Sequence, residues 1–301
     1  MRARLNDDIV AAHGQWLELW WLHEQFGRGD SIAGYLVRAN LSRSYFAAGQ
    51  LRKARMMMER DAPGLTKTPM LTPPVIAPMW TYAELLLRMR ETERAKLALR
   101  AVIDDARKGG NQKLLLQTTF TMGRALAEGG DLVGATQRLE EGVAIMRSIQ
   151  GDDPQWHITK AQLMVPLFIA QGRYADAGHE VDATFTHIGD KNKPRNRYVA
   201  PLLMLKAQLQ LAERHPTEAL ASAQQAFHLF SVNTLDAKES ADVGEAQLLV
   251  AQAQAVLGDA RNAATSARSA LGLLRKNYDA AHPLLRTAIV LAAESGGAST
   301  Q

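Results

Sequence analysis

The stretch that decides the fold is GRALAEGGDLVGATQRLEEG, residues Gly123–Gly142, in which four of the first twelve residues are glycine. Such a run raises the question of a phosphate-binding loop. A loop of that kind needs a buried strand before it, and then Lys-Ser/Thr or a dinucleotide fingerprint. Here Gly130 follows a segment with helical apolar period, and no GK[ST] occurs in the chain. The stretch therefore predicts a helix–turn–helix corner.

The same corner recurs along the chain at near-constant spacing. Each copy has an apolar helix end, a short turn that often carries glycine, two or three polar residues, and then an alanine inside a new helix. The alanines are Ala54, Ala95, Ala135, Ala177, Ala219 and Ala263, at intervals of 41, 40, 42, 42 and 44 residues. One such hairpin cannot bury its own apolar face, so neighbouring hairpins must stack. We predict an all-α superhelical solenoid of antiparallel helix pairs.

The composition agrees with this fold class. The 301 residues are 47% hydrophobic but only 6% aromatic, and strand-forming runs are nearly absent. The absence of cysteine excludes disulfides, thiolate zinc sites and cysteine nucleophiles. The net charge of +4, from 35 basic and 31 acidic residues spread along the chain, is too small to indicate nucleic-acid binding.

Local signals place the helix ends. Asp131 and Asp259 directly follow turn glycines and can cap the next helix through its free N–H groups. In RGDS, Arg28–Ser31, we expect Asp30 or Ser31 to cap the apolar helix that follows. The acidic doublets fit caps or solvated loops better than acid/base dyads. These doublets are Asp7–Asp8, Asp104–Asp105 and Asp152–Asp153.

The repeat resembles the tetratricopeptide repeat, whose pattern has a small residue in the first helix, glycine at the turn and alanine in the second helix. The third copy fits with Gly123, Gly130 and Ala135. The second and fifth copies depart from the pattern, with Arg90 and Arg214 in place of the turn glycine. A period of about 42 residues exceeds the usual 34. It resembles the subclass found in kinesin light chains and bacterial signalling proteins.

The resemblance divides the chain into three regions. Residues 1–29 form an N-terminal capping helix region, 30–280 form six helical hairpins, and 281–301 form a C-terminal capping helix with a frayed tail. The N-terminal region is rich in tryptophan, at Trp16, Trp20 and Trp21. These side chains either cap the array or form an exposed aromatic patch for a partner. The basic loop KNKPRNR, 191–197, is interpreted as a solvated inter-repeat loop rather than a phosphate clamp.

The chain carries no catalytic motif that we recognise. HExxH, GxSxG and the kinase loops are absent, and no histidine pair at i, i+4 has a third ligand nearby. We therefore expect no enzymatic activity, no metal and no cofactor, and a structural or surface role for each histidine. The histidines are His13, His23, His157, His179, His187, His215, His228 and His282.

The resemblance also implies a concave groove lined by the first helix of each hairpin. The groove positions carried onto this chain are Arg43, Trp80, Glu84, Arg88, Gln117, Arg124, Gln162, Met204, Gln208, Glu245 and Gln252. Arginine and amide side chains there can hydrogen-bond an extended ligand. The row of Arg43, Arg88 and Arg124 hints at an acidic ligand. The alternative is that this set is only the polar face of amphipathic helices.

These features favour a non-enzymatic protein–protein interaction scaffold, as the docking or sensor segment of a bacterial signalling or regulatory protein. The alternative is a ligand- or peptide-sensing domain of a transcriptional regulator or Ser/Thr kinase. A hydrolase or transferase on an all-α fold would need clustered ionisable groups, and the sequence offers none to nominate. We expect a protein or extended-peptide partner, no direct nucleic-acid contact, no membrane insertion and a cytoplasmic location.

Overall fold

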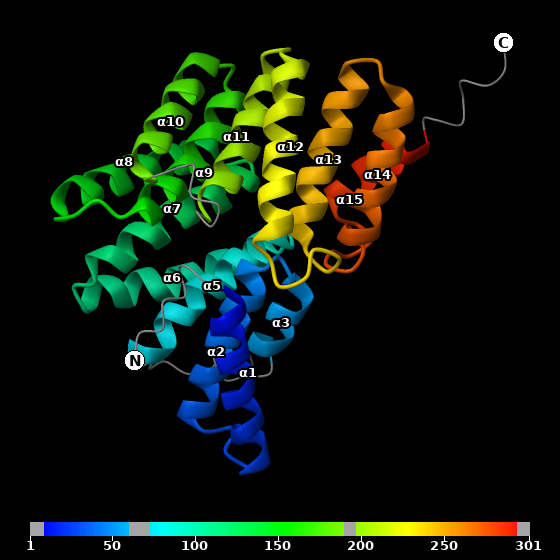
Figure 1. The fold of residues 1–301 in the computed structure, drawn as a ribbon. Coiled ribbons are helices and arrows are strands. Elements are labelled where there is room, and N and C mark those ends of the chain that lie inside the picture. The colour runs from blue at the N-terminus through cyan, green and yellow to red at the C-terminus, as the bar shows by residue number, and fades with distance from the viewer. Residues whose placement is uncertain (1–8, 60–72, 190–196, 294–301) are drawn as a thin grey trace. The chain divides into compact units, whose positions relative to one another are not determined.

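The computed structural model describes residues 9–59, 73–189 and 197–293, and among these it contains helices and no strand. The chain divides into two compact units, Met1–Gly151 and Asp152–Gln301. Both units are built from antiparallel helix pairs (Figure 1). The boundary falls in the short connection of residues 149–153 between two helices.

The first unit pairs its helices in chain order and then stacks the pairs. Its helices are α1 (Ile9–Gln25), α2 (Ile32–Ala47), α3 (Leu51–Glu59), α5 (Pro73–Arg88), α6 (Thr92–Lys108), α7 (Gln112–Glu128) and α8 (Leu132–Ser148). The hairpins are α2/α3, α5/α6 and α7/α8, while α1 packs on α2. Because α5 contacts both α2 and α7, the first helices of successive hairpins lie side by side.

The second unit repeats this arrangement. Its helices are α9 (Pro154–Ala170), α10 (Tyr174–His187), α11 (Val199–Ala212), α12 (Pro216–Val232), α13 (Ala241–Val256), α14 (Ala260–Leu274) and α15 (Pro283–Ala293). Helices α9 to α14 form three hairpins in a row, from green to orange in Figure 1, and α15 packs on α13 and α14. Among the described residues, each unit therefore holds three hairpins of an α–α solenoid.

The corner alanines are fully buried in this packing. All six are 0–2% exposed: Ala54, Ala95, Ala135, Ala177, Ala219 and Ala263. A larger side chain at such a place would hold the crossing helices apart, so the repeated alanine allows the close approach on which stacking depends. The predicted all-α fold of stacked hairpins is confirmed, and its corners lie where the repeat placed them.

The turn residues share one backbone conformation. Gly49, Gly130, Gly172 and Gly258 have φ angles of 71°, 86°, 70° and 81°. The two arginines that replace glycine, Arg90 and Arg214, both have φ of 63°. This is the left-handed region that ends a helix and that residues with a Cβ adopt only at a cost. The second and fifth hairpins therefore keep the turn geometry of the repeat without its glycine.

We predict that Arg214→Gly stabilises the second unit by up to about 1 kcal/mol, because glycine removes the left-handed strain but adds freedom to the unfolded chain. Gly172→Ala, at the same turn position of the α9/α10 hairpin, serves as the matched control and should lose about 1 kcal/mol. Urea denaturation of the full chain measures both. A less stable Arg214→Gly variant would contradict the assignment of strain to this turn.

The predicted caps are present. The Asp131 carboxylate accepts a hydrogen bond from the Gly134 N–H at 2.8 Å, and Asp259 accepts one from the Asn262 N–H at 3.2 Å. In the RGDS tetrapeptide it is Ser31 that caps, since its Oγ accepts from the Gly34 N–H at 3.0 Å. These bonds satisfy N–H groups that the first turn of a helix leaves free.

The acidic doublets have three different outcomes. Asp153 caps α9 by accepting from the Gln155 N–H at 2.9 Å. Asp104 and Asp105 lie within α6, so the expectation that they belong to a cap or a loop was wrong. Helix α6 continues through them to Lys108, and the basic side chains of Arg107 and Lys108 occupy its last turn. The doublet Asp7–Asp8 lies outside the described residues, as does the basic loop except for Arg197.

Helix α1 is only partly covered. Trp21 is 56% exposed, and Phe26, directly after the helix, is 73% exposed, whereas the indole N–H groups of Trp16 and Trp20 are buried without a hydrogen-bond partner. Its contact with α2 centres on His13, whose Nδ1 lies 2.8 Å from Ser44 Oγ. None of the described helices combines the length and the apolarity that crossing a bilayer requires.

The docking of α1 is predicted to weaken in mild acid. Burial, and then the charge of Lys53, lowers the pKa of His13 below its ordinary value of 6.5. The detached helix therefore binds more protons than the docked one as the pH falls below about 6.5. Docking of α1 becomes less favourable as the pH decreases. Tryptophan fluorescence measures the undocking of α1, because three of the five tryptophans lie in this helix. His13→Gln should remove this pH dependence and the exposed His215→Gln should not; an unchanged response in His13→Gln would refute it.

Candidate functional site

The predicted groove positions of α5 and α7 meet in one hydrogen-bonded network. The indole Nε1 of Trp80 donates to Thr121 Oγ1 at 3.0 Å, and Thr121 donates to Glu84 Oε1 at 2.6 Å. Arg124 donates to the other Glu84 oxygen at 2.7 Å. Trp80 and Glu84 lie one turn apart on α5, and Thr121 and Arg124 lie about one turn apart on α7. The network thus joins the first helices of two successive hairpins.

Thr121 is the member that the sequence analysis missed. It stands four residues after Gln117, so the helical period places it on the same face of α7 as the predicted positions. Its hydroxyl lies within 2.9 Å of the Gln117 carbonyl oxygen as well as reaching Glu84. A threonine at this spacing was the available signal, although many buried threonines bond their own helix in the same way.

The network is centred on an ion pair that is largely removed from water. The side chains of Arg124 and Glu84 are only 15% and 12% exposed. Burial opposes the charge of Arg124, but Glu84 and then Glu128 outweigh it and raise the pKa of Arg124, so the guanidinium stays cationic. Burial raises the pKa of Glu128, against the attraction of Arg124 and of Arg90, whose Nη1 lies 3.2 Å from the Glu128 carboxylate.

This pairing changes the meaning of the predicted arginine row. Arg124 already has a carboxylate partner in Glu84. Arg43, Glu84 and Arg124 occupy the same position in three successive repeats, so the charges at this position alternate along the chain. Arg88 is half-buried, with its guanidinium carbon 5.7 Å from the centre of the Phe46 ring on α2. Arg43 is exposed on α2. Recognition of an acidic ligand by this row stays a prediction.

The predicted positions of the second unit lie on successive first helices. Gln162 is on α9, Met204 and Gln208 are on α11, and Glu245 and Gln252 are on α13. Of these, Gln208 is exposed and the others are half-buried. Glu245 accepts a hydrogen bond from the Tyr278 hydroxyl. Since α11 contacts both α9 and α13, these residues occupy neighbouring helices, and their role in lining a binding groove stays a prediction.

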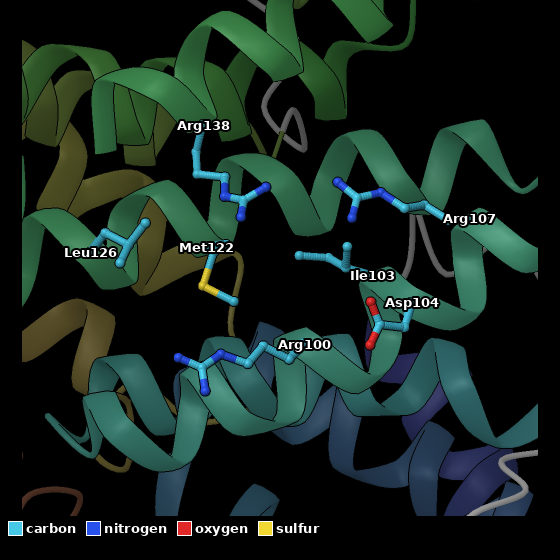
Figure 2. A pocket seen from close by; sticks show the side chains of 7 residues that line it. All are labelled: Arg100, Ile103, Asp104, Arg107, Met122, Leu126 and Arg138. Carbon is cyan, nitrogen blue, oxygen red and sulfur yellow. The ribbon is translucent and has the colours of Figure 1, made fainter. Parts of the chain in front are cut away.

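A small cavity lies away from the α5/α7 network, among α6, α7 and α8. Its volume is about 290 Å³, and Figure 2 shows three arginines around it, Arg100, Arg107 and Arg138. The remaining lining residues are Ile103, Asp104, Met122 and Leu126. Glu141 accepts from Arg107 at 2.6 Å and from Arg138 at 2.5 Å, so two of the three guanidinium groups are already paired. Its volume lies just below the range of roughly 300–1,000 Å³ that is typical of ligand pockets, so we do not take this cavity as the main site.

The fold is similar to solved structures, although no family model matches the sequence and no curated relative does. A tetratricopeptide repeat protein from Parabacteroides merdae superposes with a TM-score of 0.52 at 13% identity, over 93% of this chain and 99% of that one. The crystal structure of BtubC (BKLC) from P. vanneervenii gives a TM-score of 0.53 at 15% identity, over 68% of this chain and 84% of that one. At these identities the similarity concerns the fold.

Proposed function

We propose that this chain, which has the fold of a tetratricopeptide repeat protein, is an interaction scaffold that binds an extended peptide or a partner helix on the face formed by α5 and α7. The observation that supports this most is the network of Trp80, Thr121, Glu84 and Arg124. It fixes the rotamers of a large aromatic and of charged side chains on two adjacent helices before any ligand binds.

Such a face has the properties that peptide recognition uses. Trp80 is half-buried, so part of its ring is available for contact, and tryptophan and arginine are frequent anchors of interfaces. A side chain already held in place loses less conformational entropy on binding than a free one. Gln117, half-buried beside the network on α7, supplies an amide that can both donate to and accept from a peptide main chain.

The finer assignment is part of the same proposal. Because its repeat period of about 42 residues resembles that of bacterial signalling proteins, we propose that this chain is the docking or sensor segment of a bacterial signalling or regulatory protein, working in the cytoplasm. Binding through a preorganised surface requires no reaction, and the α5/α7 network presents a salt-bridged acid and base rather than a free nucleophile and base. The partner is a protein or peptide, with acidic sequences as one of the classes to be tested.

The experiment is selection of a displayed library of random peptides on the full chain, followed by fluorescence anisotropy with the enriched peptides. Trp80→Ala and Arg88→Glu should weaken binding by about tenfold or more, and Gln225→Ala, an exposed amide on α12 outside the predicted groove positions, should leave it unchanged. Circular dichroism verifies that each variant folds. If no peptide is enriched, or if the α5 variants bind every enriched peptide as the parent does, the proposal fails. Enrichment of acidic peptides that Arg88→Glu rejects would extend it to an acidic partner.

A further inference from the structure

A cluster of possible metal ligands lies at the open end of the α9/α10 hairpin, within the second unit. The Asp152 carboxylate bonds both His157 Nε2 and His187 Nδ1, the latter at 2.9 Å. One ligand atom from each of these three residues lies within 4.8 Å of the other two. Among the described residues, this is the group of histidines and acids that could hold an ion.

The fold brings these residues together from far apart in the sequence. His157 lies in the first turn of α9 and His187 is the last residue of α10, and the helices run antiparallel, so the start of one meets the end of the other. Asp152 stands just before the cap of α9. The expectation that the chain holds no metal considered histidines at helical spacing, and a pair 30 residues apart escapes that criterion.

We propose that Asp152, His157 and His187 form a binding site for a divalent transition metal ion such as Zn²⁺. Two imidazole nitrogens and one carboxylate oxygen are a ligand set that suits zinc, cobalt and nickel, and water completes the coordination. Aqueous Mg²⁺ and Ca²⁺ prefer oxygen ligands and are not expected to compete. The bound ion would link the two ends of the hairpin and stabilise the second unit.

The charges around the cluster favour a cation. Asp152 and Asp153 are adjacent carboxylates, and Lys160, whose charge acts on His157, is paired with Glu180 at 3.1 Å. His187 also stands at the C-terminal end of α10, where the helix dipole is negative. With both imidazoles neutral, the local charge is therefore negative before the ion binds.

One side chain must turn to complete the coordination. The two imidazole rings are stacked, with centres 3.8 Å apart and planes 5° from parallel, so one ion cannot lie in both ring planes. His157 is 8% exposed and is fixed by its surroundings, whereas the His187 side chain is 40% exposed at a helix end. Rotation of the His187 ring brings its nitrogen toward an ion that Asp152 and His157 already hold.

The test is titration of the full chain, without a histidine tag, with Zn²⁺ by calorimetry and with Co²⁺ by visible absorption. We expect one ion per chain, micromolar or tighter affinity for Zn²⁺, visible bands of low-coordinate Co²⁺ and a higher Tm with metal. Asp152→Asn and His187→Gln should weaken binding by more than the roughly 10–100-fold that changes in outer-shell partners cause. Both residues are largely exposed, at 58% and 40%, so these variants are expected to fold.

Matched controls lie on the same helix. His179→Gln and Asp182→Asn alter an exposed histidine and an exposed aspartate of α10 outside the cluster, and should bind as the parent does. The proposal is overturned if the parent shows no saturable binding of one Zn²⁺, or if His187→Gln and Asp152→Asn retain its affinity. Loss of binding in the controls to the same extent would also overturn it, since the ion would then be held elsewhere. The α5/α7 peptide assay is independent of each of these outcomes.

Discussion

Gly142→Ala is expected to destabilise the first unit by about 1–3 kcal/mol, although alanine is ordinarily the better helix former. Gly142 lies in the interior of α8, where it faces the fully buried ring of Phe120 on α7. A Cβ added at Gly142 would overlap this ring, lying 2.7 Å from Phe120 Cδ1 and closer still to Cε1. The close crossing of α7 and α8 therefore depends on the missing side chain, and relieving the overlap requires the two helices to separate or the ring to leave its rotamer.

The sign of the effect distinguishes this explanation from helix propensity. Gly14→Ala, in the interior of α1 of the same unit, is the matched control because a Cβ there meets nothing within 4 Å. It should gain about 0.5–1 kcal/mol. Phe120→Leu in the Gly142→Ala background should recover part of the loss, giving a coupling of about 0.5–3 kcal/mol between the two sites. Urea denaturation measures the parent, the three single variants (Phe120→Leu included) and the double variant; a stabilising Gly142→Ala, or strict additivity with Phe120→Leu, would show that the ring does not limit this position.

The parts of the fold that could be predicted are those that short-range geometry determines. A turn glycine, a capping aspartate and a corner alanine act within one hairpin, so each repeat carries its own signal. Arg90 and Arg214 show that residue type alone does not reveal every turn, because the turn keeps its left-handed φ even where glycine is absent. The near-constant interval between alanines identified these two turns where the residue type did not.

The candidate site was predictable only in part, because its interactions span successive repeats. Helical spacing placed Trp80, Glu84 and Arg124 on the expected face, but which of them pair depends on how α5 and α7 stack. Glu84 and Arg124 are 40 residues apart, and the repeat that makes them neighbours was visible in the sequence. Their opposite charges at equivalent positions were a signal of mutual pairing that the interpretation as an arginine row left unused.

The histidine cluster could not be predicted from the repeat pattern of the sequence, for a related reason. His157 and His187 lie at the two ends of a hairpin, and no repeat-to-repeat equivalence links them. Their meeting depends on the lengths of α9 and α10, which fix how far the second helix returns along the first. A difference of a single turn in either helix would place the rings about 5.4 Å apart along the axis. Such precision exceeds what helix boundaries inferred from a sequence provide.

Glu84→Ala is expected to produce the largest loss among single variants of the α5/α7 network. It leaves the Arg124 guanidinium charged at 15% exposure without its main partner, and it removes one of the two acceptors of the Thr121 hydroxyl. Removing one partner of a fully buried ion pair destabilises a protein by about 3–5 kcal/mol. Since both side chains keep some access to water, we expect about 2–4 kcal/mol here. Glu93→Ala on α6 is the control, because its side chain is 82% exposed and its pairing with Lys96 is worth little.

Replacing both partners separates stability from recognition. Glu84→Leu with Arg124→Met removes the charges together, so the double variant should regain most of the stability that Glu84→Ala loses. Chemical denaturation and the peptide assay are then carried out on the same protein. A single-variant loss below about 0.5 kcal/mol would mean that water already compensates Arg124. If the double variant is as stable as the parent but no longer binds the enriched peptides, the ion pair acts in recognition, because a purely structural pair would leave binding intact once the helices are packed again.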